Sequence, residues 1–241
     1  MSIKVMKFGG SSLSDDYKMG LAAKKVIDFI NKGEKVVVIV SAQGDTTDSL
    51  LEQINRISKN PSKRELAVLV STGEQISCSK FAILLQEMGY QAVSLLGWQA
   101  GILTTSDYEQ AKIKEIDPDR IWKELNKNQV VVIAGFQGID EQDNITTLGR
   151  NGSDTSALAI AAALEQKECY IFTDIDGVYD KDPNQHSDAK KIPYLSYEDM
   201  MKLAKKGAKV LHDRCIHIAQ KYKIKIIVKS TFGEEEGSIV G

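Results

Sequence analysis

Residues 3–12 read IKVMKFGGSS and decide the fold, because residues 3–8 form a short strand pattern that ends in two glycines and two serines. Apolar residues then recur at helical spacing at Met19, Ala22 and Val26. A second strand of the buried type follows at residues 35–40. This β-α-β beginning is typical of a parallel sheet covered by helices on both faces.

The rest of the chain continues this alternation. We expect further strands at residues 91–95, 129–134, 145–148, 167–172 and 225–229. We expect further helices at residues 49–57, 66–88 (interrupted at 71–74 by polar residues), 155–164, 196–205 and 214–221. A mixed insertion fills residues 98–116, and residues 173–183 form a loop. The sequence predicts one α/β domain with a mostly parallel sheet, whose site lies at the carboxyl ends of the strands.

The composition excludes several classes of protein. The 241 residues carry 31 basic and 33 acidic side chains, and no block of five or six like charges occurs, so we expect no nucleic-acid or membrane partner. We expect neither a secretory signal nor a membrane span, because the longest aliphatic runs are short. The three scattered cysteines favour a reducing, cytoplasmic location.

Lys7, Gly9 and Gly10 form the first candidate ligand site. Backbone N–H groups in a glycine turn and a following helix dipole both favour an anion such as phosphate. The usual P-loop places its lysine after the glycines, which is not the order here. A plain glycine turn that closes a strand explains these residues equally well.

Residues 149–154, GRNGSD, form a second glycine loop before a helix. Arg150 could fork onto a carboxylate or phosphate, and Asp154 falls in the first helical turn. Ser153 or Asp154 could instead cap the helix. Two such glycine loops in one α/β chain favour a phosphate-bearing ligand.

Other polar residues are ambiguous when they are taken singly. Residues 173–179, TDIDGVY, follow a strand directly, although Asp-Gly is also an ordinary turn. Glu74 is either a solvated edge residue or the acceptor for a cationic group, and Lys209 alone would be a solvated helix residue. The three histidines lack the spacings of zinc sites or catalytic triads, so they are interpreted as structural or exposed, and no metal ligand is assigned to the chain.

Six blocks together resemble the aspartate kinase family over residues 4–237. They are KFGGSS (7–12), VSAQGDTTD (40–48), STGEQ (71–75), GWQAG (97–101), TTLGRNGSDT (146–155) and TDIDGVY (173–179). The resemblance implies a three-layer αβα sandwich over residues 1–241, with an amino-acid-binding N-terminal part and a nucleotide-binding part from about residue 170. It also implies a homodimer that phosphorylates the side-chain carboxylate of L-aspartate with ATP and Mg²⁺, the first step of lysine, threonine and methionine biosynthesis.

The resemblance also implies roles for individual residues. Nucleotide contacts fall on Lys7, Phe8, Gly9, Gly10, Thr173, Asp174, Tyr179, Asn184, Lys209 and Val210. The aspartate pocket falls on Ser41, Thr47, Glu74, Arg150, Asn151, Gly152 and Ser153, with Arg150 on the α-carboxylate and Glu74 on the α-ammonium. Catalysis falls on Lys7, Asp154 and Lys209, with Asp154 holding the lysines in place.

This assignment agrees with the chemistry of the reaction. The aspartate side chain has a reference pKa near 3.9 and attacks as a carboxylate, so it needs no general base. The main difficulty is repulsion between two anionic reactants, which lysines, backbone amides and Mg²⁺ offset. The motifs accordingly contain cations and glycines and no catalytic histidine.

Four residues depart from the family pattern. Ser11 replaces a threonine and keeps the hydroxyl group, while Asn151 replaces a glycine, which a left-handed backbone tolerates. Asn184 stands where arginine is common, which weakens the expected nucleotide contact. Asp213 stands where proline is usual, and we have no functional interpretation of it.

Typical members of the family continue into regulatory ACT domains, which we do not expect within these 241 residues. We expect a shortened piece, a natural short form, or a catalytic chain that uses a separate ACT-containing partner. The alternatives are kinases that act on glutamate, N-acetylglutamate, carbamate or UMP, a non-catalytic nucleotide sensor, and a generic α/β binding domain. Glu74 and residues 97–101 favour a free amino acid as acceptor.

Overall fold

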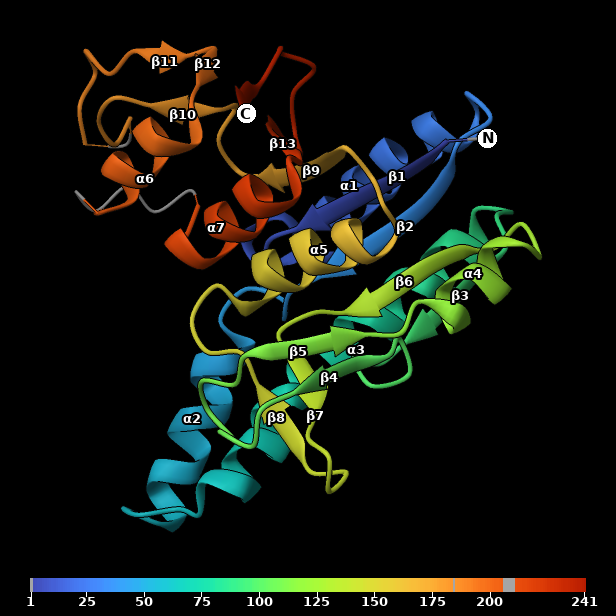
Figure 1. Ribbon diagram of the computed structural model, residues 1–241, viewed down its shortest axis with the longest axis vertical. Coiled ribbons are helices and arrows are strands. Elements are labelled where there is room, and N and C mark those ends of the chain that lie inside the picture. The colour runs from blue at the N-terminus through green and yellow to red at the C-terminus, as the bar shows by residue number, and fades with distance from the viewer. Residues whose placement is uncertain (1, 184, 206–210) are drawn as a thin grey trace.

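The central sheet of the computed structural model, which describes residues 2–183, 185–205 and 211–241, has the strand order β12-β14-β13-β9-β1-β2-β6-β3 (Figure 1). Its strands are β1 (Ile3–Phe8), β2 (Lys35–Val40), β3 (Ala92–Leu95), β6 (Val130–Ala134), β9 (Glu168–Thr173), β12 (Tyr194–Leu195), β13 (Lys225–Ser230) and β14 (Ser238–Val240). The strands from β13 to β3 are parallel, and β14 pairs antiparallel with β13. The mostly parallel sheet predicted from the sequence is confirmed.

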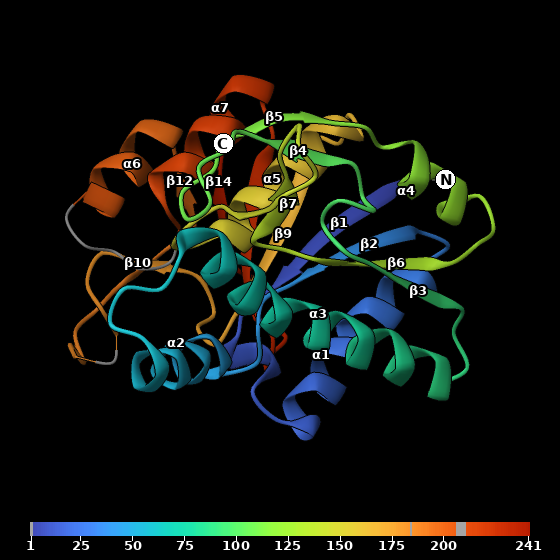
Figure 2. The same ribbon diagram turned by 90° about the horizontal axis from the view of Figure 1, so that it is seen from below.

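Helices cover both faces of this sheet (Figures 1 and 2). The helices of the described residues are η1 (Ser11–Leu13), α1 (Asp16–Ile30), α2 (Thr46–Ile57), α3 (Lys63–Glu87), α4 (Asp119–Leu125), α5 (Gly152–Ala163), α6 (Tyr197–Lys205) and α7 (Asp213–Tyr222). α1 and α3 pack on one face, and α5 and α7 pack on the other. The α/β class and the three-layer sandwich are therefore confirmed.

The strands have nearly continuous apolar sequences because both faces of the sheet are buried. Side chains alternate across the sheet, so Val5 and Val37 join the core beneath α5 and α7. Phe8 and Val38 join the core beneath α1 and α3. Two hydrophobic cores therefore pack against the sheet from opposite sides. The ends of its strands remain available to form ligand sites.

A second sheet was not predicted, although its strand at residues 145–147 was expected at 145–148. Four short strands form it in the order β5-β4-β7-β8. They are β4 (Ile102–Thr104), β5 (Ile113–Ile116), β7 (Gln137–Ile139) and β8 (Ile145–Thr147), and a further pair joins β10 (Val178–Tyr179) to β11 (Lys191–Ile192). Strands of two to four residues are too short to show an alternation of apolar and polar side chains. The expected insertion at 98–116 therefore contains β4 and β5, and the expected loop at 173–183 contains β10, as a correction to the sequence prediction.

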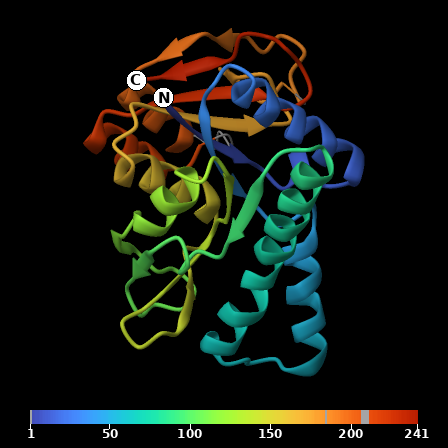
Figure 3. The ribbon, with the colours of Figure 1, turned by 90° about the vertical axis from the view of Figure 1, so that its right-hand side faces the viewer.

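Helix α3 is continuous through residues 71–74, whose polar side chains interrupt its apolar pattern without breaking the helix. Gly73 lies inside the helix, where an added Cβ would come within 2.9 Å of the Cβ of Ala42. The glycine therefore marks a close approach of the helix to the loop after β2. Figure 3 shows α2 and the first half of α3 extending together beyond the central sheet.

Two helices begin at positions that differ from the sequence prediction. The 3-10 turn η1 follows the glycine pair, and α1 begins only at Asp16, where the Asp15 side chain accepts a hydrogen bond from the Lys18 N–H at 2.8 Å. Helix α2 begins at Thr46, three residues before the expected start at residue 49. These shifts arise because polar helix starts carry no apolar period.

Two further expectations concern the setting of the chain. None of the helices in the described ranges is long and apolar enough to cross a membrane. The cysteines Cys78, Cys169 and Cys215 are buried and unpaired. Burial raises the pKa of the Cys78 thiol to about 12, so this thiol is a weak nucleophile.

Phe8→Ala should lower the free energy of unfolding by about 3–5 kcal/mol, because it empties a fully buried site. The Phe8 ring stacks on Phe172, with centroids 4.8 Å apart, and on Phe81 at 5.9 Å. Phe232→Ala is the control, and its partly exposed ring should cost less than about 1 kcal/mol. Urea unfolding measures both values, and equal losses would contradict the placement of Phe8.

Candidate functional site

The candidate site lies where parallel strands end together. Phe8 at the end of β1 is in register with Val40 of β2 and with Phe172 of β9. The residues that follow these strands therefore meet at one edge of the sheet. Chain segments far apart in sequence supply this edge, as expected for an open α/β sheet.

A cavity of about 280 Å³, which we call the Arg150 cavity, opens at this edge. Its lining is Lys7, Gly10, Ser41, Thr47, Glu74, Phe136, Gly149, Arg150, Asn151, Gly152 and Ser153. The seven residues assigned to the amino acid by resemblance all lie in this lining, while Phe136 and Gly149 were missed. The volume lies near the lower end of the range for small-molecule sites and suits a ligand of amino-acid size.

Lys7 and Asp154 form an ion pair at this edge. The Lys7 Nζ lies 2.6 Å from the Asp154 Oδ1, and the two side chains are only 11% and 7% exposed. Asn151 occupies the N-cap of α5, and no side-chain hydrogen bond caps this helix, so Asp154 does not cap it. Each of the two buried charges therefore depends on the other for compensation.

Glu74 is buried in α3 although it lines the cavity, and only 4% of it is exposed. Its Oε2 atom has no hydrogen-bond partner among the described residues. Burial raises the pKa of Glu74 to about 7, against the opposing effects of the Ala42 N–H and the Lys7 charge. A donor that entered the cavity would satisfy this oxygen, and a cationic donor would also favour the ionised carboxylate.

Arg150 supplies a second positive group. Its side chain is exposed and forms no hydrogen bond or ion pair with the part of the chain that the structure describes. Its neighbours Gly149 (φ +74°) and Asn151 (φ +57°) have left-handed backbones. The expectation that a left-handed backbone accepts Asn151 is confirmed. Positive groups at Lys7 and Arg150 therefore share the cavity with the Glu74 carboxyl group.

A second hollow of about 420 Å³, the Tyr179 hollow, lies beside the ends of β9 and β13. Its lining is Asp174, Ile175, Asp176, Tyr179, Pro183, Ser230, Phe232, Gly233 and Glu235. Of the residues predicted to contact the nucleotide, Asp174 and Tyr179 lie here, and the Thr173 hydroxyl bonds the Asp174 carboxylate at 2.9 Å. The residues of 230–235 were missed, although the rule that sites follow parallel strands could have found them.

Asp176 anchors the wall of the Tyr179 hollow. The Tyr179 hydroxyl donates to its Oδ1 at 2.6 Å, and the Lys191 ammonium lies 2.9 Å from its Oδ2. The hydrogen bond from Tyr179, followed by that from Lys191, lowers the pKa of Asp176. The same bond raises the pKa of Tyr179 to about 12. This network holds residues 174–179 in place.

The structure shows which groups of the glycine turn after β1 are buried and which approach neighbouring loops. The Phe8 side chain lies in the core, and its carbonyl accepts the Ser41 N–H at 3.2 Å, so neither group points into a cavity. A Cβ on Gly10 would lie 2.7 Å from the Ala42 carbonyl, and Gly9 lies close to the Lys7 Nζ. Three further predicted contacts, Asn184, Lys209 and Val210, fall outside the described residues.

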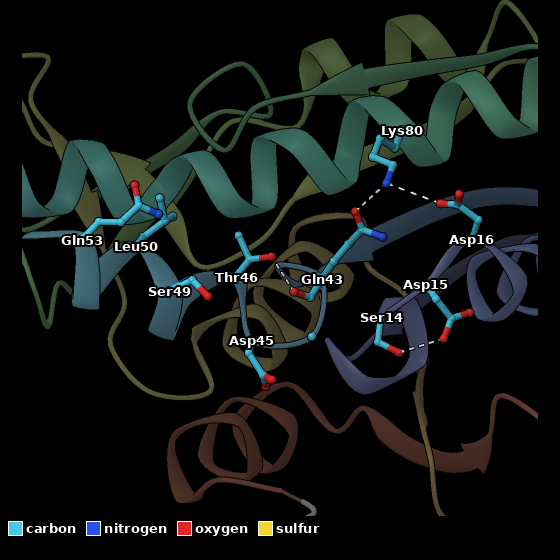
Figure 4. A pocket seen from close by; sticks show the side chains of 11 residues that line it. Ser14, Asp15, Asp16, Gln43, Asp45, Thr46, Ser49, Leu50, Gln53 and Lys80 are labelled. Atoms are coloured by element: carbon cyan, nitrogen blue, oxygen red, sulfur yellow. Dashed lines mark hydrogen bonds and ion pairs between the residues drawn. The ribbon is translucent and has the colours of Figure 1, made fainter.

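A third hollow, of about 630 Å³, lies between the loops after β1 and β2 and helix α3 (Figure 4). Lys80 points into it and binds the Gln43 Oε1 at 2.9 Å and the Asp16 carboxylate at 3.5 Å. None of the residues that the sequence assigned to the site lines it. Several of its polar groups bond one another, as Lys80, Gln43, Thr46, Ser14 and Asp15 do, and we assign it no ligand.

The sandwich has two hollows at the carboxyl edge of its sheet, which is where open α/β proteins bind their ligands. The Amino acid kinase family matches residues 2–230. The chain therefore belongs to the amino acid kinase family.

Relatives within this family are similar over the whole chain. The chain is 47% identical over 240 residues to an aspartokinase of Geobacillus stearothermophilus and 45% identical over 240 residues to aspartokinase 2 of Bacillus subtilis. Each match covers 100% of this chain and 59% of the relative. The chain thus spans less than two thirds of the length of these curated relatives.

Solved structures agree with this relationship. The crystal structure of aspartate kinase from Synechocystis matches with a TM-score of 0.87 at 41% identity, over 100% of this chain and 40% of that one. The structure of E. coli aspartokinase III in complex with aspartate and ADP matches with a TM-score of 0.89 at 26% identity, over 100% and 64%. A UMP kinase from Ureaplasma parvum, at 17% identity and a TM-score of 0.73, shares the fold.

Glu74→Gln should remove a pH dependence of folding. The raised pKa means that the folded protein binds this proton more tightly than the unfolded chain, so the stabilisation is present below pH 4.5 and is lost as the pH rises to about 7. The free energy of unfolding of the variant, minus that of the wild type, should therefore increase as the pH rises from 4.5 to 8, by an amount on the order of 3 kcal/mol.

Urea unfolding at several pH values measures this difference. Glu87→Gln, at the exposed end of the same helix, is the matched control and should show no such trend. A stability difference between Glu74→Gln and wild type that stays constant from pH 4.5 to 8 would show that Glu74 does not titrate in this range.

Proposed function

We propose that this chain transfers the γ-phosphoryl group of ATP to the side-chain carboxylate of L-aspartate and forms 4-phospho-L-aspartate. The observation that carries the proposal is the charge pattern of the Arg150 cavity, in which Lys7 and Arg150 share a small space with the unsatisfied Glu74 oxygen. Similarity over the whole chain to aspartokinases of about 45% identity supports it.

Recognition of the acceptor follows from this pattern. The Arg150 guanidinium, free of partners among the described residues, would bind the α-carboxylate through two parallel hydrogen bonds. Glu74 Oε2 would accept the α-ammonium, which an N-acylated amino acid or a nucleotide lacks. Thr47 and Ser153 would complete the pocket with hydroxyl groups. The side-chain carboxylate would then be directed toward Lys7.

Lys7 would act on the reacting groups. The attacking carboxylate is already ionised at neutral pH, so catalysis consists of positioning and charge stabilisation. Asp154 fixes the Lys7 ammonium at 2.6 Å and so limits its motion. A preoriented ammonium stabilises the charge that develops on the transferring group without reorganising during the reaction.

The nucleotide would occupy the Tyr179 hollow, with its phosphates directed toward the glycine turn at residues 9–10. This placement gives the chain an amino-acid-binding N-terminal part and a nucleotide-binding part from about residue 170. Mg²⁺ would arrive with the substrate as MgATP, because the described residues include no group of three or more potential metal ligands. Phosphates together with one or two carboxylates commonly hold this ion. In the Tyr179 hollow, Asp174 would supply such a carboxylate.

We also propose the setting that the family resemblance implies. The product would feed the biosynthesis of lysine, threonine and methionine in the cytoplasm. The active form would be a homodimer, either with a separate ACT-containing regulatory chain or without one. Size-exclusion chromatography with light scattering would test the dimer.

A hydroxamate-trapping assay with coupled ADP detection tests the reaction directly. L-Aspartate with MgATP should give both ADP and an acyl hydroxamate, while glutamate, N-acetylglutamate, N-acetyl-L-aspartate, carbamate and UMP should give neither. Activity with another acceptor in place of aspartate would overturn the substrate assignment. Tight ATP binding without turnover on any acceptor would favour a nucleotide sensor.

Lys7→Met should lower kcat by about 100-fold or more with a smaller effect on the KM for ATP, because the group acts mainly in the transition state. The substitution leaves Asp154 buried without a partner, which costs about 3–5 kcal/mol of stability. The double variant Lys7→Met/Asp154→Asn removes that charge and should fold better while remaining inactive.

Lys4→Met is the matched control on the same strand. Lys4 pairs with Glu168 at 3.3 Å, away from the cavity lining, so its removal should leave kcat unchanged. Normal turnover by a folded Lys7→Met enzyme would remove Lys7 from the catalytic role.

A further inference from the structure

Arg214 connects the C-terminal part of the chain to the loop that carries Arg150. It lies in the first turn of α7, and its Nη1 donates a hydrogen bond of 2.7 Å to the carbonyl of Leu148, 66 residues earlier in the sequence. Leu148 immediately precedes residues 149–152, which we call the acceptor loop. The Arg214 side chain does not line the Arg150 cavity, so it acts on the cavity only through this loop.

The other hydrogen bonds of the acceptor loop differ in kind from the bond that Arg214 donates. The Leu148 N–H donates to the Phe136 carbonyl at 2.8 Å, and the Gly152 N–H donates to the Gly149 carbonyl at 3.0 Å. Both are backbone bonds: the first joins residues 136 and 148 on either side of β7 and β8, and the second lies within the loop itself. By contrast, the bond from Arg214 is charge-assisted and comes from helix α7, which is distant along the chain. It therefore ties the loop to α7.

The turn at residues 149–151 is also enclosed by neighbouring groups. Gly149 and Asn151 both have left-handed backbones, which glycine and asparagine tolerate. A Cβ on Gly149 would lie 3.2 Å from the Glu109 carbonyl and 3.8 Å from the Arg214 Nη1, so the turn is enclosed between these groups. The other end of the guanidinium reaches the Gln110 Oε1 at 3.5 Å. Arg214 thus closes one side of the turn.

We infer that Arg214 is a positioning residue, which holds the Leu148 carbonyl so that the acceptor loop presents Arg150 to the α-carboxylate of the amino-acid substrate. The inference rests on the proposed function and extends it to a residue outside the cavity lining. Because the restraint acts on the amino-acid side of the site, its loss should weaken acceptor binding far more than nucleotide binding.

Steady-state kinetics of Arg214→Met provide the first test. The KM for L-aspartate should rise about tenfold or more, while kcat at saturating aspartate and the KM for ATP stay within about threefold of wild type. Arg214→Lys should recover part of the aspartate affinity, because an ammonium can still donate one hydrogen bond to Leu148. Lys221→Met removes a charge from the exposed end of the same helix and should change nothing.

Hydrogen exchange followed by mass spectrometry provides the second test and does not depend on activity. The Gly152 amide, which bonds the Gly149 carbonyl, should exchange about tenfold faster in Arg214→Met than in wild type or Lys221→Met. Faster exchange together with the selective rise in the aspartate KM supports the inference.

Two results would overturn it. One is an unchanged rate of Gly152 exchange in Arg214→Met. The other is a loss of thermal stability with equal effects on both KM values, which would mark a purely structural residue. A wild-type enzyme that forms no acyl phosphate from aspartate would instead refute the proposed function, and the exchange of Gly152 would still decide whether Arg214 orders the loop.

Discussion

The buried ion pair between Lys7 and Asp154 is the interaction on which the site depends. It joins the end of β1 to the first turn of α5, and thus the central sheet to one of its covering layers. Apolar side chains of similar volume often stabilise a core as well as a buried ion pair does, so folding alone does not require these charges. Their position beside a ligand-sized cavity accounts for them better, because the pair holds a positive charge where two anionic reactants would meet.

Two further charged residues, Glu74 and Arg150, line the cavity beside this ion pair. Glu74 and Arg150 give the Arg150 cavity one acidic and one basic group besides Lys7, which matches the two charges on the backbone of a free amino acid. The burial that raises the pKa of Glu74 also leaves its Oε2 without a hydrogen-bond partner among the described residues, so the cavity suits an incoming cationic donor. Arg214 then supports Arg150 from outside, through the Leu148 carbonyl. The recognition of the acceptor therefore depends on contacts from several layers of the sandwich.

The sequence predicted the order of the main strands and helices and most of the residues that line the Arg150 cavity. Strands β1 and β2 have the predicted bounds, because their apolar runs are long and end at polar or glycine turns. Strand β8 of the second sheet was predicted at residues 145–148, while β4, β5 and β7 were missed because each is only three or four residues long. The polar residues at 71–74 of helix α3 were recognised as unusual for a core helix, but the close approach of Gly73 to Ala42 was not foreseeable. The bond from Arg214 to Leu148 depends on a tertiary contact that no local pattern records. Residues 230–235, by contrast, lie at and directly after the end of the parallel strand β13 and could have been expected at the site.

The measurement that tests the central claim most directly is a crystal structure with L-aspartate, Mg²⁺ and a non-hydrolysable ATP analogue. The account predicts that the aspartate side chain and the terminal phosphate lie on either side of the Lys7 ammonium, with the reacting atoms about 3–3.5 Å apart. It also predicts that the aspartate backbone lies between Glu74 and Arg150. A terminal phosphate bound far from Lys7, or an aspartate bound outside the Arg150 cavity, would contradict it.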